Sequence, residues 1–344
     1  MLWFARRKMV TNRIVLVIIF SLTIVILLRN FISTLPEHLP YDSFSERGNH
    51  PFMSSSILRT PERQPETVLE YPIQFMKLCN NDIVRMVEDK PKLVSILANY
   101  ISNYPLQGFH YLEDIKNRNR NGFPRTHLLF DFMGPLLFQC PHMKAFGSGD
   151  EEKRFCWTKE YDEEKRCTVF SVGSNNQYGF EEDIIRKAPN CHVHIFDCTL
   201  PNGFIVPSSL QEHVSTYDLC LGAENSGKFR TFIQLIEIAQ VDHVTLIKFD
   251  IEGYEWPVLE GIIQTAKEEQ KRTGKILLPD QIAVEIHYGN APGGLPWNGR
   301  DRDAGEMHFF FQYLFFSGGY VLAERRDNIL CEICSEILLV RVVC

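Results

Sequence analysis

The sequence predicts an α/β protein built on a doubly wound, Rossmann-like parallel sheet that ends in an antiparallel hairpin. Apolar runs typical of buried strands alternate with helical patterns from Cys167 to His287, and two strand-like runs joined by a short connection follow near the C-terminus. In the segment Val244–Gly261, an apolar strand ends in acidic residues where a helical pattern begins. Ligands of open α/β sheets bind at that edge.

The segment Val244–Gly261 is the clearest of these patterns. Its first seven residues, Val244–Asp250, are apolar apart from one lysine, as expected for a strand buried on both faces. Pro257 suits a first helical turn, because no hydrogen-bond donor is lost there. The apolar residues that follow recur on one helical face, which predicts a helix continuing to Lys271.

The remaining elements are predicted from the same periodicities and from the positions of Gly and Pro. No clear period is found over residues 111–164. In chain order, the other predicted elements are a strand at Cys167–Gly173, a helix at Phe180–Lys187, strands at Cys191–Cys198 and Tyr217–Gly222, a helix at Phe232–Ala239, a strand at Gln281–His287, a helix at Glu306–Phe316, and the hairpin strands Tyr320–Glu324 and Glu336–Val342.

The N-terminal residues predict a membrane signal anchor at residues 14–32. Ile14 to Leu28 is an uncharged apolar run between Arg13 and Arg29. A helix of this length spans about 22 Å, and apolar residues up to position 32 extend it towards a hydrocarbon core of roughly 30 Å. The basic tail at residues 1–13 is expected in the cytoplasm, which makes this a type II membrane protein whose bulk faces the lumen of the endoplasmic reticulum or Golgi. A cleaved signal peptide is the alternative, although no small-residue cleavage site follows.

The rest of the chain divides by composition. Residues 33–71 contain five prolines and little apolar periodicity, which predicts an extended stem. A helical pattern begins after Tyr71, and residues 72–139 are predicted to be a helical N-terminal extension of the α/β domain at residues 140–344.

Charge and cysteine content restrict the function and the compartment. The net charge of −7 does not suggest a nucleic-acid partner. Ten cysteines agree with an oxidising lumen. Cys331 and Cys334 form one C-x-x-C pair without a second, which is poor support for zinc, so disulfides or buried thiols are expected.

Three residues at strand ends predict a ligand site. Gly173 ends the first strand and lets a ligand approach the backbone closely, while Asp197 ends the second strand 24 residues later. An acid at that spacing holds the hydroxyls of an adenosine ribose in nucleotide-binding folds. Asp250 ends the fourth strand, next to the first, so all three should converge. A nicotinamide dehydrogenase is disfavoured because the G-x-G-x-x-G pattern is absent, whereas S-adenosylmethionine carries a ribose without phosphate.

The residues CTVFSVGSNNQYGFEEDI, VHIFDC, TLIKFDIEGYEWPVLEG and IAVEIHY resemble those of FkbM-type methyltransferases, and most closely the animal methyltransferase-like 24 group. The resemblance covers roughly Cys140 to Val343, and the D-x-E-G-x-E stretch is its most specific part. It implies a class I methyltransferase sheet of strand order 3-2-1-4-5-7-6, S-adenosylmethionine as cofactor, and methyl transfer to oxygen.

The resemblance also implies roles for individual residues. In one position the chain departs from the family: Ser171 stands where the D-x-G-x-N loop of FkbM-type proteins begins with an acid. Asp197 is expected to hold the ribose, and Asp250 to face the reacting end. The other expected cofactor contacts are Ser171, Gly173, Ser174 and Asn175 on the methionine side and Gly222, Ala223 and Glu224 near the adenine.

Methyl transfer to a hydroxyl needs a base, because a hydroxyl is a poor nucleophile. His287 ends the fifth strand beside Asp250, and its ordinary pKa of about 6.5 suits that role. Glu252 and Glu285 are alternative catalytic groups. A divalent metal held by Asp250, Glu252 and His287 is a further alternative, since it would lower the pKa of the hydroxyl.

Two other functions remain open. The long loop Gly289–Gly305 suits a lid, and it contains Trp297, which could stack on a sugar. It also contains Asp301-Arg302-Asp303, a D-x-D sequence that would fit a type II membrane glycosyltransferase. The second alternative is a non-catalytic, methyltransferase-like binding protein of the lumen. We expect instead a membrane-bound methyltransferase, held through Ile14 to Leu28, that acts on a hydroxyl-bearing glycan, lipid or small molecule.

Overall fold

The computed structural model describes residues 77–101, 133–158, 161, 167–287, 304–328, 331 and 334–344. The predicted anchor, the predicted stem and residues 289–303 of the predicted lid, with Trp297 and Asp301-Arg302-Asp303, lie outside these residues. Within the described part of the chain, no helix is long and apolar enough to cross a membrane.

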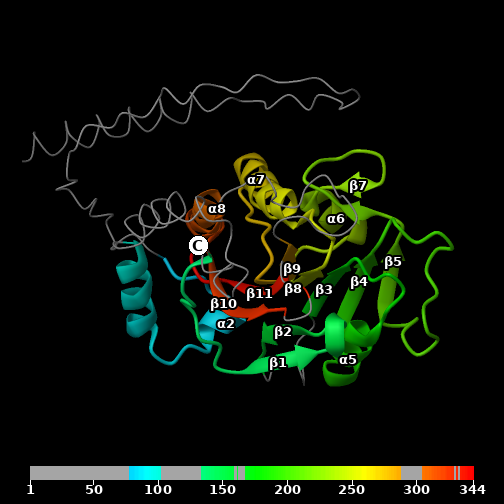
Figure 1. Cartoon of the computed structure of the whole chain (residues 1–344), viewed down its shortest axis with the longest axis horizontal. Helices are drawn as coiled ribbons and strands as arrows, with labels where there is room; N and C mark the ends of the chain where they lie inside the picture. Colours follow the sequence, from blue (N-terminus) through cyan, green and yellow to red (C-terminus); the bar gives the residue numbers. More distant parts are fainter. Residues whose placement is uncertain are drawn as a thin grey trace, which may run out of the picture. The chain divides into compact units, whose positions relative to one another are not determined.

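A seven-stranded mixed sheet forms the centre of the described structure (Figure 1). Its order is β10-β11-β9-β8-β3-β4-β5. Numbered along the chain within this sheet, the order is the predicted 3-2-1-4-5-7-6, which is thereby confirmed. The inner strands are parallel, and β11 runs antiparallel to both β9 and β10. The strands are β3 (Cys167–Val172), β4 (Cys191–Phe196), β5 (Val214–Tyr217), β8 (Leu246–Phe249), β9 (Gln281–His287), β10 (Tyr320–Asp327) and β11 (Cys334–Arg341).

Helices cover both faces of the sheet, which explains why its central strands are apolar throughout (Figure 1). On one face lie α6 (Phe232–Ala239), α7 (Glu255–Thr273) and α8 (Ala304–Gly318), over one hydrophobic core. On the other lies α5 (Gly179–Lys187), beside the hairpin of β1 (Met143–Phe146) and β2 (Lys153–Cys156). Before these elements the chain forms the short helix α2 (Asp82–Arg85) and a helical segment at residues 90–101.

Helix α7 positions the strand-to-helix junction that the sequence singled out. Its apolar residues Trp256, Val258 and Leu259 are buried against the sheet, and it ends at Gly274, which adopts the left-handed conformation. The indole nitrogen of Trp256 donates a hydrogen bond of 2.8 Å to the carbonyl of His287, the last residue of β9. The start of the helix is therefore tied to the end of the neighbouring strand.

One predicted strand was wrong in position. The third parallel strand is Val214–Tyr217 rather than Tyr217–Gly222. Beyond Tyr217 the chain turns, with the Leu219 amide donating to the Tyr217 carbonyl, and leaves the sheet. After residues 218 and 219 the chain forms β6 (Cys220–Leu221). This strand pairs in parallel with β7 (Phe229–Arg230) in a separate two-stranded ribbon. The β1–β2 hairpin lies where the sequence showed no period.

All ten cysteines are paired in disulfides. Cys331 and Cys334 bond to each other, so their thiolates are not available to a zinc ion. The other pairs are Cys79–Cys344, Cys140–Cys156, Cys167–Cys191 and Cys198–Cys220.

The bond between α7 and β9 gives a first prediction. Trp256→Phe keeps an aromatic ring but leaves the buried His287 carbonyl without its donor, so the free energy of unfolding is expected to fall by about 2–4 kcal/mol. Urea denaturation of the full chain measures this value. Phe309→Leu on α8, at a side chain that is 40% exposed, is the control and should change it by less than about 0.5 kcal/mol. Equal losses in the two variants would contradict the role of Trp256.

Candidate active site

A cavity of about 420 Å³ opens at the carboxyl ends of β3, β4 and β8. This is the edge at which open α/β sheets bind ligands, and the volume lies in the range of small-molecule sites. Of the residues predicted from the sequence, the cavity is lined by Gly173, Ser174, Asn175, Asp197, Asp250 and Glu252. Residues that the sequence did not single out also line it, among them Glu151, Lys153, Lys248, Phe229 and Tyr254.

The loop after β3 bends sharply into the cavity. Gly173 has φ +76°, and a side chain there would place its first carbon 2.3 Å from the carbonyl oxygen of Asp250, so only glycine fits. Asn175 and Asn176 follow with φ of 48° and 58°. The Ser174 hydroxyl is buried and has no hydrogen-bond partner among the described residues. A buried hydroxyl without a partner in a cavity wall is a group that a bound ligand can satisfy.

The Asp197 carboxylate forms the wall at the end of β4. One oxygen accepts the Asn175 amide at 2.8 Å, and the other accepts the amide and the hydroxyl of Thr199 at 2.9 and 2.6 Å. A carboxylate offers about four acceptor positions, so about one remains on the oxygen that faces Asn175. Asp197 therefore shapes the loop after β3 and can still accept one ligand hydroxyl.

Ser171 lies beneath this loop and does not line the cavity. Its hydroxyl donates a hydrogen bond to Glu181 of α5, which is fully buried. Burial raises the pKa of Glu181, while the charge of Lys248 and the Ser171 hydrogen bond act in the opposite direction. Lys248 in turn donates to the Gly173 carbonyl at 3.1 Å. The chain thus has no acid at position 171 itself, but the carboxyl group of Glu181, from α5, lies next to Ser171.

Gly222, Ala223 and Glu224 lie just outside the cavity lining, and the preceding residues Cys220 and Leu221 line it instead. The Gly222 amide donates to the Arg230 carbonyl, which holds the β6–β7 ribbon together. Ala223 packs against the backbone at Gly261 of α7. These three residues directly follow β6, so they adjoin the ribbon whose residues line the cavity.

Glu255, the last acid of the D-x-E-G-x-E stretch, organises the loop that carries Asp250 and Glu252. It is fully buried, and its carboxylate accepts the amides of Ile251 and Gly253 at 3.0–3.1 Å. It also lies 3.2 Å from Nδ1 of His287. Glu252, at φ +55° and 71% exposed, reaches within 3.6 Å of the other ring nitrogen of His287.

His287 is held between carboxylates behind the cavity lining. Burial alone would lower its pKa, but the hydrogen bond and charge of Glu255, together with the charges of Asp250 and Glu285, raise the pKa to about 9. His287 is therefore an imidazolium at neutral pH. In that state it donates to Glu255 and has no lone pair with which to accept a proton.

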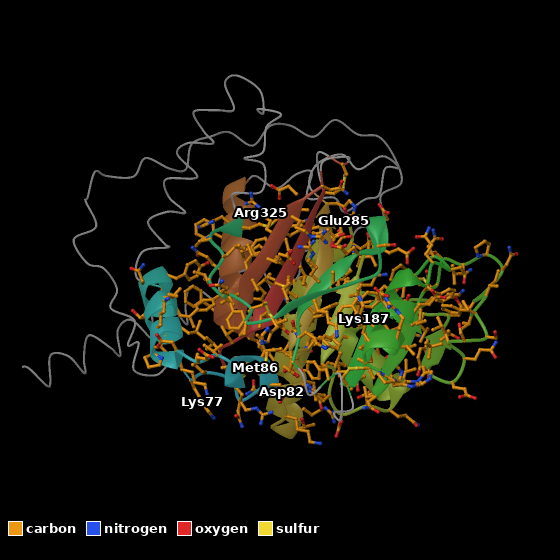
Figure 2. The ribbon with its side chains drawn as sticks, turned by 90° about the horizontal axis from the view of Figure 1, so that it is seen from below. Lys77, Asp82, Met86, Lys187, Glu285 and Arg325 are labelled. Atoms are coloured by element: carbon orange, nitrogen blue, oxygen red, sulfur yellow. A yellow bond between two sulfur atoms is a disulfide. The ribbon has the colours of Figure 1, made fainter. Side chains whose placement is uncertain are left out.

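A second charged cluster lies on the hairpin side of Asp250. Lys153 of β2 is only 1% exposed, forms an ion pair with Glu336 of β11, and lies 3.6 Å from Asp250. Glu285 of β9 lies at the end of the sheet away from Asp82 (Figure 2). Burial and the charges of Asp250 and Glu336 raise the pKa of Glu285 to about 7. The carboxylate oxygens of Asp250, Glu285 and Glu336 lie within 4.8 Å of one another.

Two groups in these clusters have the spacing of metal ligands among the described residues: Asp250, Glu285 and Glu336, and Asp250, Glu255 and His287. In the first, the Lys153 ammonium already supplies the positive charge. In the second, the ring of His287 would have to release its proton before it could bind a cation. A third group includes Cys334, whose sulfur is in a disulfide.

The fold and the cavity define a Rossmann-like protein with a site for an adenosine-type ligand. The model of a methyltransferase-domain family matches residues 114–341, and the chain belongs to that family. Its cofactor is S-adenosylmethionine. The match begins inside the segment predicted as an N-terminal extension. The FkbM-type resemblance stays a prediction.

Solved structures resemble the chain only weakly. The fibrillarin pre-rRNA processing protein of Methanococcus jannaschii shares 13% identity and covers 59% of this chain and 84% of its own, with a TM-score of 0.33. An O-methyltransferase family protein of Burkholderia thailandensis shares 10%, covering 51% of each chain, with a TM-score of 0.29. The N-methyltransferase NodS of Bradyrhizobium japonicum shares 12%, covering 51% of this chain and 85% of its own, with a TM-score of 0.28. Among curated proteins, no relative matched the sequence.

The residues present fit the cofactor. The cavity has the required size, Ser174 has an unused hydroxyl, and Asp197 retains an acceptor position for a ribose hydroxyl. Gly173, Ser174, Asn175 and Asp197 would hold it, at the site predicted from the sequence.

The ion pair of His287 and Glu255 predicts a pH-dependent stability. The folded pKa of about 9 exceeds the ordinary 6.5, so the stabilisation is fully present below pH 6.5 and is lost as the pH rises through 9. We expect the wild type to lose on the order of 3 kcal/mol between pH 6 and 10 through this group.

Urea denaturation of the full chain across this pH range measures the loss. His287→Gln and Glu255→Gln should each lower stability at pH 6 and flatten the dependence on pH, because each removes one charge of the pair. An unchanged slope in both variants would contradict the assignment.

Proposed function

We propose that the chain transfers the methyl group of S-adenosylmethionine to a hydroxyl oxygen of a glycan or another polyhydroxylated acceptor in the secretory lumen. The observation that carries this proposal is the Asp250 side chain. It lines the cavity, and its oxygen Oδ1 is buried with no hydrogen-bond partner among the described residues. A carboxylate in this position can accept the hydrogen of a hydroxyl and then its proton.

The surrounding charges support a role in proton transfer. S-adenosylmethionine, when bound, supplies an electrophilic methyl carbon. Methylation of a hydroxyl releases one proton, and in this proposal Asp250 receives it. Glu285 lies within the same carboxylate cluster, and its pKa of about 7 allows it to hold or release that proton near neutral pH. His287, already protonated, positions Glu252 and Glu255 instead of acting as the base.

The charge of the cavity favours an uncharged acceptor. Among its lining residues, four acids, Glu151, Asp197, Asp250 and Glu252, face two lysines, Lys153 and Lys248. Glu336 adds a carboxylate behind Asp250, and Glu285, with its pKa of about 7, adds part of a negative charge at neutral pH. Like charges would repel a phosphate, sulfate or carboxylate group on the acceptor. Hydroxyl groups, by contrast, can donate to these carboxylates, as the hydroxyls of a neutral sugar do.

The compartment is proposed from the cysteines and the N-terminal sequence. Five disulfides account for every cysteine, which is typical of proteins that fold in an oxidising lumen. The apolar run Ile14–Leu28 after a basic tail supports a type II membrane anchor. We therefore place the proposed activity in the endoplasmic reticulum or Golgi, where glycans with free hydroxyls are built.

Substitution of Asp250 tests the proposal. The full chain is incubated with methyl-labelled S-adenosylmethionine and a panel of neutral glycans and glycolipids, and label in an alkali-stable methyl ether is expected. Asp250→Asn should reduce its formation by about 10²–10⁴-fold, because the amide cannot accept a proton. Binding of S-adenosylhomocysteine, measured by calorimetry, should stay within about threefold of the wild type, since the Asn side chain keeps the shape of the cavity wall.

The matched control is Asp242→Asn, at an exposed residue that precedes β8, whereas the cavity lies beyond the carboxyl end of that strand. It should leave the methylation rate unchanged. Methyl transfer at the wild-type rate by Asp250→Asn would exclude Asp250 as the proton acceptor. Label found only on amines or carboxylates would exclude the hydroxyl acceptor.

A further inference from the structure

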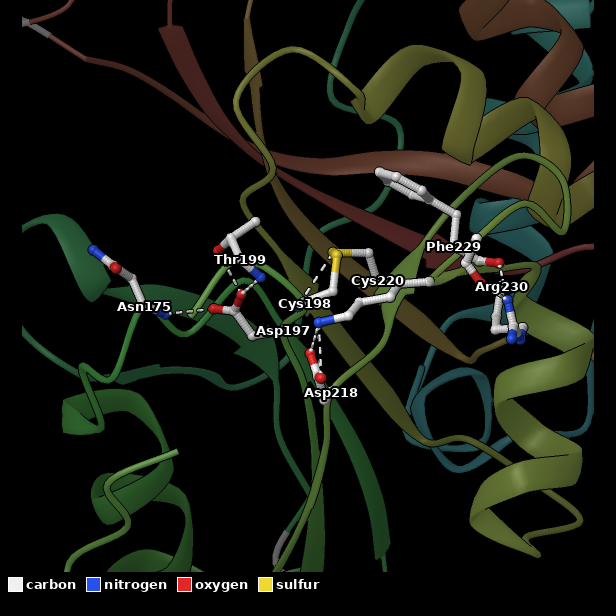
Figure 3. The surroundings of a disulfide bond; sticks show 10 residues. Asn175, Asp197, Cys198, Thr199, Asp218, Cys220, Phe229 and Arg230 are labelled. Carbon is white, nitrogen blue, oxygen red and sulfur yellow. Dashed lines mark hydrogen bonds and ion pairs between the residues drawn. A yellow bond between two sulfur atoms is a disulfide. The ribbon is translucent and has the colours of Figure 1, made fainter. Parts of the chain in front are cut away.

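A disulfide joins Cys198 to Cys220 beside the Asp197 carboxylate (Figure 3). Cys198 directly follows Asp197 at the end of β4, and Cys220 begins β6. Cys220 itself lines the cavity. The bond joins two segments 22 residues apart at the point where each reaches the cofactor site.

On the β4 side, the disulfide adjoins the residues that shape the Asp197 wall. The Cys198 amide donates to the Cys220 sulfur at 3.3 Å. The next amide, that of Thr199, donates to Asp197, whose other oxygen holds the Asn175 amide (Figure 3). The position of Cys198 thus affects the short turn that aims the Asp197 carboxylate.

On the other side, the disulfide holds the β6–β7 ribbon. This ribbon has two residues in each strand and is not hydrogen-bonded to the seven-stranded sheet as a strand. Cys220 pairs with Phe229, and the Cys220 amide donates to the Lys228 carbonyl. Leu221 and Phe229 both line the cavity. So small a ribbon has little stability of its own, and the covalent bond to Cys198 fixes it beside β4.

We propose that the Cys198–Cys220 disulfide is a positioning element of the cofactor site, so that affinity for the cofactor depends on its oxidation. The disulfide fixes the distance between Asp197, in the cavity wall at the end of β4, and Leu221 and Phe229, in the wall formed by the ribbon. Without it, the ribbon must be ordered when the cofactor binds, and that ordering reduces the affinity. The inference rests on the assignment of this cavity to S-adenosylmethionine.

The chain contains a matched control for this bond. Cys167 and Cys191 join β3 to β4 with a sequence separation of 24, close to the 22 of the proposed positioning disulfide. They pair at the amino ends of these strands, opposite the cavity, and do not line it. Because the closed loops are of similar length, removing either bond relaxes the unfolded chain to a similar extent.

Calorimetry with S-adenosylhomocysteine compares the full-length wild type with Cys198→Ala/Cys220→Ala and Cys167→Ala/Cys191→Ala. We expect the first double variant to raise Kd by about tenfold or more and the second to leave Kd within about threefold, since only the first loses preorganisation of the site. Melting temperatures, recorded in parallel, should fall in both. Comparing Kd and melting temperature in the two double variants distinguishes an effect on the cofactor site from a general loss of stability.

Similar Kd values for the two double variants would overturn the inference and leave the proposed hydroxyl methylation intact. A wild type that does not bind S-adenosylhomocysteine would overturn the cofactor assignment and the inference together. Disulfide-dependent binding without methylation of any hydroxyl acceptor would overturn only the proposed function.

Should Cys198→Ala/Cys220→Ala not fold, partial reduction of the wild type replaces it. Cysteines released by a phosphine reductant are alkylated and identified by mass spectrometry. Binding capacity is expected to fall in step with alkylation of Cys198 and Cys220, at a stage when Cys167 and Cys191 are still bonded. Full binding by protein alkylated at both Cys198 and Cys220 would overturn the inference.

Discussion

The buried carboxylate of Glu255 is the group on which the proposed catalytic edge depends. It accepts the amides of Ile251 and Gly253 and pairs with His287, so one side chain closes the loop after β8 and joins it to the end of β9. A fully buried charge of this kind is tolerated only when it is paired and hydrogen-bonded. Loss of either partner would leave an uncompensated charge below Asp250, at the centre of the site.

Much of the fold and of the cavity could be predicted from local sequence, because the alternation of strands and helices and the acids at strand ends are encoded by neighbouring residues. The α6 helix and the place of Gly173, Asp197 and Asp250 at one cavity were predicted in this way, whereas the complete sheet order was implied by the family resemblance. The error at Tyr217–Gly222 arose because two short strands, one in the sheet and one outside it, are separated by a single turn. Apolar content alone does not say which of the two pairs with β4.

The residues that sequence reasoning missed act across elements far apart in the chain. Lys153, in a hairpin without a clear sequence period, contacts Glu336, which lies 183 positions further along the chain. Glu181, from the helix that follows, accepts the hydrogen bond of the Ser171 hydroxyl, and only its place in the first turn of α5 could have suggested this contact. His287 was correctly placed beside Asp250, but its pKa depends on Glu255, whose burial no local pattern reveals.

The two walls of the cavity are held by different kinds of interaction. Towards β9 and the hairpin, ion pairs around Lys153 and His287 set the charge, and their strength depends on protonation. Towards β4 and β6, a covalent bond sets the distance, and it depends on the redox state of the compartment. A site for a cofactor without phosphate cannot rely on a glycine-rich phosphate loop to hold the ligand. Because recognition then falls to the ribose and adenine walls, a rigid connection between those walls contributes directly to affinity.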